Sequence, residues 1–229
     1  MKPMKPKKPH KKEERTPTDA LRLYSALTHG IGAWLASIAV AVLIFWAAMT
    51  GSAWQVVSFS VYGFTLIALY TASTLYHSLR LRPSRRLTLR KLDHVMIYML
   101  IAGTYTPICL VSLREQKAWG WAIFGVIWGV ALIGAVVKLC VKNPPRGIST
   151  ATYLLMGWLV IVVIIPLVKV MTTTSLVLLG AGGLCYTVGA ILYALKWPKK
   201  DSKYFGFHEV FHIFVLLGSV CHYIMMFFL

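Results

Sequence analysis

The stretch Phe207-His208-Glu209-Val210-Phe211-His212 opens the last apolar segment of this 229-residue chain. The run from Val210 to Leu229 carries no formal charge and is long enough to cross a bilayer, which takes about 20 apolar residues. His208 and His212 are four residues apart, so a helix places both imidazoles on one face. Imidazole is the commonest metal-binding side chain, and such a pair is half of a metal site. The stretch therefore predicts a membrane helix with a metal-binding end.

The composition of the whole chain is that of a membrane protein. Hydrophobic residues make up 58% and charged residues 14%, with a mean hydropathy of +0.68, which is too apolar for a soluble domain of this size. Lys and Arg total 24 against 7 Asp and Glu, and this excess indicates cytoplasmic loops and anionic lipid headgroups. No soluble domain remains to present a basic face, so nucleic acid is not an expected partner. The four cysteines lie apart in apolar runs, which is typical of reduced structural cysteines.

Seven apolar runs are each long enough to cross a bilayer, and the gaps between them are short. We therefore expect one domain over residues 23–229, an all-α integral membrane protein folded as a bundle of seven transmembrane helices. Residues 1–22 form a Lys- and Pro-rich tail whose composition predicts disorder. A cleavable signal peptide is not expected, because the first apolar run is as long as a full span. The expected spans are Gly30–Met49, Trp54–Leu79, His94–Leu113, Ala118–Val137, Gly147–Val168, Thr172–Leu195 and Phe207–Leu229.

Prolines and glycines mark particular places in these spans. Pro107 and Pro166 lie inside the third and fifth spans, where the missing N–H predicts a kink in each helix. Gly125 and Gly129 form a Gly-x-x-x-Gly pair, which permits close packing of one helix against another. The pair does not specify a dimer, so homo-oligomer formation is left open.

The distribution of basic residues predicts the orientation in the membrane. Of the 24 Lys and Arg, 21 lie in the tail and in the gaps after the second, fourth and sixth spans. Only Arg114, Lys117 and Lys169 lie in gaps on the other side. The positive-inside rule then predicts a cytoplasmic N-terminus and an outside C-terminus. We expect a multi-pass protein of the cell membrane, which is the inner membrane in a Gram-negative source.

Ionisable residues gather at the inner ends of the predicted spans, on helices far apart in sequence. His77 closes the second span, Asp93 opens the third, and His208 and His212 open the seventh. Such groups are costly at membrane depth and are interpreted first as functional. His77, His208 and His212 would form a three-His metal site with one position open, a ligand set that suits Zn²⁺ and leaves room for a water. Zinc is therefore the expected cofactor.

Asp93 and Ser73 are the candidate catalytic residues beside this metal. Ser73 lies four residues before His77, on the same helical face, where its hydroxyl could orient a bound water or a substrate oxygen. Asp93 is the candidate to hold or deprotonate that water. Taken singly, Asp93 could instead cap a helix, Ser73 could bond back to its own helix, and His77 could extend to the interface. The shared depth of the three histidines favours metal binding.

Glu209 raises a separate alternative, because His208-Glu209-x-x-His212 spells the metalloprotease helix in which Glu is the general base. A soluble protease cleft has no residues to spare here, so only an intramembrane protease would fit. Glu209 also lies about 100° round the helix from His208, and the macrodipole favours an acid at a helix N-terminus. We keep Glu209 and His29 as candidate neighbours of the ligands. His222 is about 15 Å further along the helix, too far to bind the same ion.

These residues together resemble the hemolysin III branch of the progestin and adipoQ receptor (PAQR) superfamily. The resemblance covers nearly all of residues 25–229. The matching pieces are Thr28-His29-Gly30, Ser73-x-x-x-His77, Leu92-Asp93-His94, Gly103-Thr104-Tyr105-Thr106-Pro107, His208-x-x-x-His212 and Cys221-His222.

The resemblance implies a seven-helix bundle with zinc near the cytoplasmic face, bound by the three histidines, with Asp93 and Ser73 beside it. The superfamily includes alkaline ceramidases, which implies hydrolysis of lipid amides or esters. The family usually carries an acid about seven positions before the histidine of the first span, where this chain has Arg22. It also needs no Glu between the two histidines of the last span, which lowers the weight of Glu209 as a base.

Three functions follow as alternatives. The first is a zinc-dependent hydrolase of a lipid-like amide or ester at the inner leaflet, in which the pKa of the zinc-bound water falls to about 7 and Asp93 handles its proton. The second is a non-enzymatic, receptor-like regulator whose zinc is structural. The third is a pore-forming hemolysin, for which we find no amphipathic pore-lining pattern. The expected partners are membrane lipids and a lipid-like substrate or ligand.

Overall fold

The computed structural model describes residues 22–141, 146–198 and 205–229. Within these ranges every regular element is helical, and seven helical segments are long and apolar enough to cross a membrane. This confirms the predicted seven-helix membrane bundle. The predicted disordered tail, except for Arg22, lies outside the described residues.

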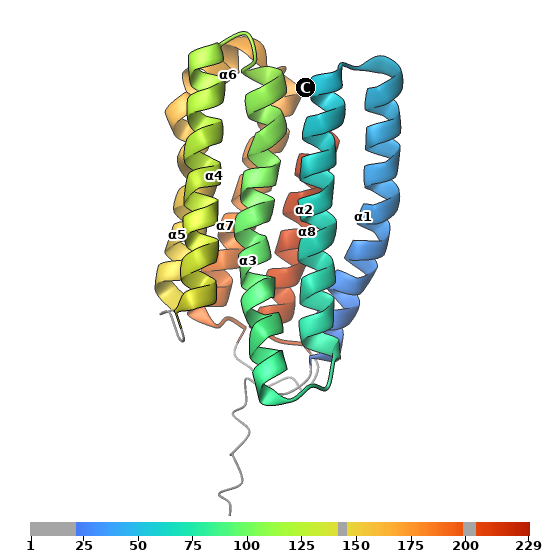
Figure 1. Ribbon diagram of the computed structural model, residues 1–229, viewed down its shortest axis with the longest axis vertical. Helices are drawn as coiled ribbons and strands as arrows, with labels where there is room; N and C mark the ends of the chain where they lie inside the picture. The colour runs from blue at the N-terminus through green and yellow to red at the C-terminus, as the bar shows by residue number, and fades with distance from the viewer. Residues whose placement is uncertain (1–21, 142–145, 199–204) are drawn as a thin grey trace, which may run out of the picture.

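The helices run up and down along the long axis of the bundle (Figure 1). In the first half the chain forms α1 (Leu23–Thr50), α2 (Ala53–Ser78), α3 (Pro83–Pro107) with the π-helical turn η2 (Ile108–Ser112), and α4 (Lys117–Cys140). The fifth span combines α5 (Arg146–Trp158), the 3-10 segment η3 (Leu159–Val163) and α6 (Ile164–Val170). The last two spans are α7 (Thr173–Leu195) and α8 (Phe207–Met226). The chain ends at the opposite end of the bundle from the start of α1 (Figure 1).

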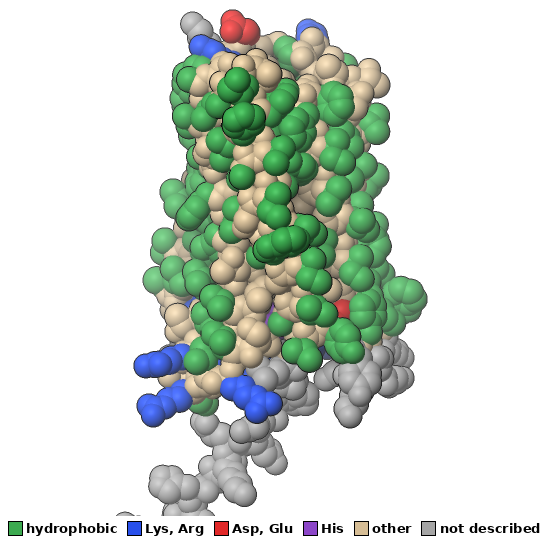
Figure 2. All heavy atoms as spheres, turned by 90° about the vertical axis from the view of Figure 1, so that its right-hand side faces the viewer, with side chains coloured by type: hydrophobic (Ala, Val, Ile, Leu, Met, Phe, Trp, Pro, Cys, Tyr) green, Lys and Arg blue, Asp and Glu red, His purple; other side chains and the backbone are tan. Residues whose placement is uncertain are grey.

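The packing places α2 between α1 and α3, and α8 against α7 and α1. The approach of α3 to α2 depends on Gly103, because a Cβ there would overlap the Thr65 side chain. Figure 2 shows hydrophobic side chains covering the flank of the bundle, with Lys and Arg gathered mainly at its lower end. We call this lower end, where α1, α3 and α8 begin, the basic end. The flank therefore suits contact with lipid chains, and the basic end suits contact with headgroups.

Two helices begin earlier than the sequence analysis predicted. α1 begins at Leu23 rather than Gly30, and α3 begins at Pro83 rather than His94. Hydropathy marks where a helix enters the apolar layer, but a charged segment can continue the same helix into the headgroup region. Pro83 starts α3 well, because a helix has no use for an N–H in its first turn. Asp93 consequently lies inside α3, whose N-cap is Arg82, so Asp93 is not a helix cap.

Both prolines lie where the α-helical hydrogen-bonding pattern changes. Pro107 ends α3, and in the following π-helical turn the Leu113 N–H donates to the Ile108 carbonyl at 3.0 Å. Pro166 lies in α6, directly after the 3-10 segment η3. Since proline lacks the N–H that would bond one turn back, it interrupts the regular ladder at each place.

Candidate metal centre

Three histidines from two helices meet at the basic end of the bundle. His77 lies in the last turn of α2, and His208 and His212 lie in the first two turns of α8. The Nε2 atoms of His77 and His208 are 3.1 Å apart, and one ligand atom from each histidine lies within 4.8 Å of the other two. Across the part of the chain that the structure describes, this is the one group of three or more His, Cys, Asp or Glu close enough to share an ion.

The spacing of the His77 and His208 nitrogens fits a zinc ion, whereas the three ligand atoms as a group lie within 4.8 Å of one another. Tetrahedral zinc with Zn–N bonds of about 2.0–2.1 Å separates its ligand atoms by roughly 3.3 Å, close to the 3.1 Å between His77 and His208. The ring of His77 is inclined at 72° to that of His208 and at 66° to that of His212, so the three rings do not stack on one another. Three imidazoles form the donor set of a zinc site that keeps a fourth position for water.

Residues of α1 hold the ring of His212 in place. His29 stacks on it, with ring centroids 3.6 Å apart and planes inclined by 4°. The Thr28 hydroxyl donates to the Ser25 carbonyl at 3.0 Å, and its oxygen lies 3.3 Å from Nδ1 of His212. Because the hydroxyl proton is already used, the oxygen accepts from His212 Nδ1–H. This contact leaves the His212 lone pair on Nε2, where it is available to a metal.

Glu209 is held away from the metal centre by hydrogen bonds at the start of α8. Its Oε1 accepts from the Ser25 hydroxyl at 2.7 Å and from the Arg22 guanidinium at 3.4 Å, and its Oε2 accepts from the Gly206 N–H at 2.9 Å. Both oxygens are therefore engaged: Oε1 joins the start of α1 to α8, and Oε2 caps the first turn of α8. The geometry does not support Glu209 as a metalloprotease base. Arg22, the residue just before α1, forms an ion pair with this carboxylate.

Asp93 and Ser73 line the same cavity as the three histidines. Ser73 is buried, and among the residues that the structure describes its Oγ has no hydrogen-bond partner within 3.5 Å, so it does not bond back to its own helix. Asp93 lies next to Ser73 and within 3.8 Å of the ring of His94, whose Nδ1 is bonded to its own helix at the Arg90 carbonyl. The structure thus brings all five predicted residues to the walls of one cavity.

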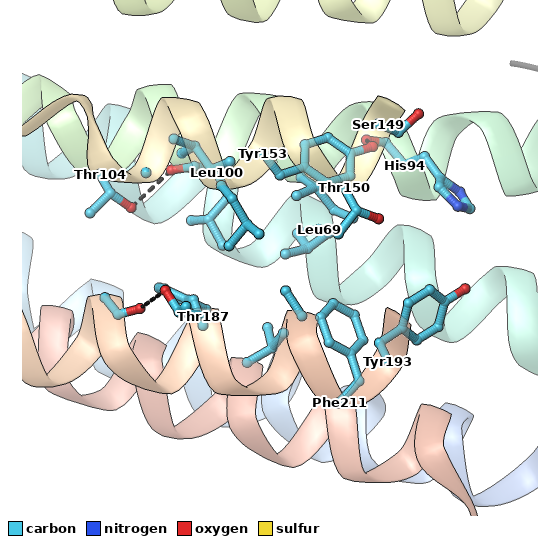
Figure 3. Close-up of a pocket in the computed structure, with 18 of the residues that line it drawn as sticks. Leu69, His94, Leu100, Thr104, Ser149, Thr150, Tyr153, Thr187, Tyr193 and Phe211 are labelled. Atoms are coloured by element: carbon cyan, nitrogen blue, oxygen red, sulfur yellow. Dashed lines mark hydrogen bonds between the residues drawn. The ribbon is translucent and has the colours of Figure 1, made fainter. Parts of the chain in front are cut away.

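This cavity has a volume of about 590 Å³ and extends from the metal centre into the bundle. Figure 3 shows Leu69, Leu100 and Phe211 between its two ends, with His94 and Tyr193 at one end and Thr104 and Thr187 at the other. Ligand sites are mostly apolar cavities of roughly 300–1,000 Å³ with a few polar groups, and this cavity matches that description. Cationic side chains line its basic end, namely Arg22, Arg86, Arg90, Lys91 and Lys138.

Three neighbours of the site were not predicted from the sequence. The Tyr193 ring of α7 lies 5.6 Å from that of His208. Lys138 of α4 is buried and donates to the Ser149 hydroxyl of α5 at 3.0 Å. Thr28 of α1, which contacts His212, was named in the sequence analysis only as part of the motif Thr28-His29-Gly30. A tyrosine or lysine near a helix end is common in membrane proteins, so the sequence alone did not mark these residues as neighbours of the site. A lysine at the end of a span is the feature that comes closest to such a mark, because ionisable groups near membrane depth are costly.

Comparison with known proteins places this chain in a family. The family described as Haemolysin-III related matches residues 22–223. The chain is 43% identical over 204 residues to Hemolysin-3 of Bacillus cereus, covering 89% of this chain and 87% of that protein. It is 40% identical over 195 residues to a Hemolysin-3 homolog of Bacillus subtilis, covering 85% and 87%. It is 26% identical over 179 residues to the human monocyte to macrophage differentiation factor, covering 76% and 71%.

The extent of these matches agrees with the resemblance seen in the motifs, and with a multi-pass protein of the cell membrane. From its first helix to the last turn of α8, the chain belongs to the haemolysin-III-related family.

Proposed function

We propose that the protein is a zinc-dependent hydrolase of lipid-like amides or esters, acting from the inner leaflet. The observation that carries the proposal is the three-His cluster at one end of an apolar cavity. A ligand set with an open position and a long apolar cavity are the two features that such a reaction needs. His77, His208 and His212 would hold the ion.

When bound, zinc would supply a Lewis acid and a water whose pKa is about 7. Asp93 would accept and hold the proton released from that water. Ser73, next to Asp93 in the cavity wall, would donate to the carbonyl oxygen or orient the water. Leu69, Leu100 and Phe211 would bind the hydrocarbon chain and exclude bulk water from the reacting bond.

The Asp93→Asn variant tests the proposal. Asparagine keeps the size and much of the hydrogen bonding but removes the base. Zinc content and thermal stability should stay near wild type, while turnover of short-chain ceramide-like amides and esters should fall by roughly 10²–10⁴. The proposal fails if wild-type protein hydrolyses no member of a broad panel and the variant loses zinc.

A second candidate is a receptor-like regulator with structural zinc. It is favoured by the position of the cluster, which joins α2 to α8 across the bundle. In this case the fourth zinc ligand would come from the protein rather than from water, and Asp93→Asn would reduce zinc affinity or stability instead of turnover.

The name of the Bacillus cereus relative suggests a third candidate, cytolysis, and release of a dye from lipid vesicles by purified protein would test it.

A further inference from the structure

His222 lies at the far end of the cavity, away from the metal centre. It is ten residues after His212 on α8, which places it about 15 Å further along the helix axis. Its side chain lines the cavity and is almost fully buried, with the residue 6% exposed. An ionisable residue at this depth of a membrane helix is expected to serve a function. The proposed hydrolysis uses no group here.

Contacts with α7 fix the orientation of the His222 ring. Its Nε2 lies 3.3 Å from the Leu179 carbonyl oxygen, an acceptor, so Nε2 carries the proton and Nδ1 carries the lone pair. Tyr186 packs its ring edge-on to the imidazole, with centroids 5.4 Å apart. A Cβ at Gly182 would overlap the ring, so only glycine there leaves room for the imidazole between α7 and α8.

The lone pair on Nδ1 has no hydrogen-bond partner among the described residues, although the atom is buried. Leaving such an acceptor unsatisfied costs about 1–3 kcal/mol, so buried polar groups almost always find a donor. Hydroxyls on the neighbouring walls are already engaged. Tyr186 shares a hydrogen bond of 2.9 Å with Ser219, and Thr187 donates to its own helix at 2.7 Å, as the dashed line in Figure 3 shows. No described residue supplies the donor, and because His222 lines the cavity, a group bound there is the remaining source.

We propose that His222 forms a second polar subsite, which accepts a hydrogen bond from a hydroxyl group of the bound ligand. The ligand is then a long amphiphile with one polar group at the metal centre and a hydroxyl about 15 Å away, matching the distance between His212 and His222. A plain hydrocarbon chain would reach the same place without satisfying Nδ1. The inference rests on the proposed lipid-binding role of the cavity and narrows the class of lipid.

Matched fatty acids test the subsite without any need for turnover, because they resemble products of amide or ester hydrolysis. Each unbranched fatty acid is compared with its ω-hydroxy analogue over a series of chain lengths, by equilibrium binding to the purified, zinc-loaded protein. The hydroxylated acid should bind about five- to tenfold more tightly, as expected for one net hydrogen bond of about 1 kcal/mol. The preference should be greatest at the chain length that reaches His222 and smaller on either side.

The His222→Phe variant keeps a ring in the space left by Gly182 and removes the acceptor. It should bind both acids equally and the plain acid no more weakly than wild type does. Tyr223→Phe is the matched control, because the Tyr223 hydroxyl donates to the Ala39 carbonyl at 2.9 Å and does not line the cavity. This control should keep the wild-type preference.

Three results would overturn the inference, two by refuting the subsite alone and one by refuting the lipid-binding role of the cavity as well. Equal binding of both acids to the wild type, or a preference that persists in His222→Phe, refutes the subsite and leaves the proposed function standing. No binding of either acid at any chain length refutes the lipid-binding role of the cavity, and the subsite with it.

Discussion

At the residue scale, the three histidines contribute donor atoms in unequal surroundings. His212 is held by two residues of α1, with His29 stacked on its ring and Thr28 at its Nδ1, whereas His77 contacts His208 directly through Nε2. A three-ligand site loses much of its geometry when any ligand is removed, so His77→Ala, His208→Ala and His212→Ala should each sharply lower zinc occupancy from about one per chain. Elemental analysis of purified protein measures this. His94→Ala is the control, because His94 lies outside the group of three histidines whose ligand atoms approach one another closely enough to share an ion.

The role of Glu209 gives a second prediction at this scale. Glu209→Gln should keep zinc and turnover within a few-fold of wild type, because the carboxylate faces Ser25, Arg22 and Gly206 rather than the cavity. The loss of charge at the start of α8 should reduce stability by about 0.5–2 kcal/mol, the range found for helix caps. Thermal unfolding and hydrolysis, measured on the same variant, distinguish a structural role of Glu209 from a catalytic one. A stable, zinc-loaded variant without turnover would restore Glu209 as a catalytic base.

The candidate residues could be named from the sequence because their types and spacing are restrictive. Two histidines four apart are on one face of any helix, and His77 is the histidine at the end of the second span. The partners of Glu209 could not be predicted in the same way. Ser25 and Arg22 meet it only because α1 crosses the start of α8, and that contact depends on packing between segments at opposite ends of the chain.

At the element scale, hydropathy predicted that each helix exists but not where each begins. The inner turns of α3 carry Arg85, Arg86 and Arg90, which lower the hydropathy of that segment without disfavouring a helix. Long basic side chains can extend their charge to the headgroups while their stems remain against the bundle. For this reason Asp93 was predicted at the end of a helix and is found inside one.

Glycines in the spans differ in how closely another helix approaches them, so replacing them should affect stability to different degrees. Gly103 faces Thr65 at the α2–α3 contact, whereas Gly125 and Gly129 have nothing within 4 Å of an added Cβ. Gly103→Leu should therefore destabilise the protein by about 1–3 kcal/mol, as overpacking does, while Gly125→Leu should leave the monomer as stable as wild type. Thermal unfolding in detergent compares the two variants. Equal losses in both would contradict the packing, and a smaller particle mass in Gly125→Leu alone would indicate that the glycine pair joins two copies.

At the scale of the whole molecule, the bundle has one basic end, and the cavity opens among its cations. Arg22, Arg90 and Lys91 lie half-buried around the end that holds the three histidines. If the positive-inside rule applies, both the metal centre and the cavity entrance lie at the cytoplasmic leaflet. The orientation therefore decides from which leaflet a lipid could enter, and it links the topology to the proposed reaction.

The orientation can be measured with a thiol that the chain already carries. Cys140 ends α4 at the basic end and is the one exposed cysteine, since Cys109 is buried and the other two are half-buried within spans. A cytoplasmic basic end predicts that a membrane-impermeant maleimide labels Cys140 in inside-out vesicles but not in intact cells. Cys140→Ser should abolish the labelling. Moving the thiol to the other end, as Glu115→Cys in the Cys140→Ser background, should reverse the pattern, because the exposed Glu115 lies between the third and fourth spans. Labelling of Cys140 from outside intact cells would invert the bundle and place the metal centre at the outer leaflet.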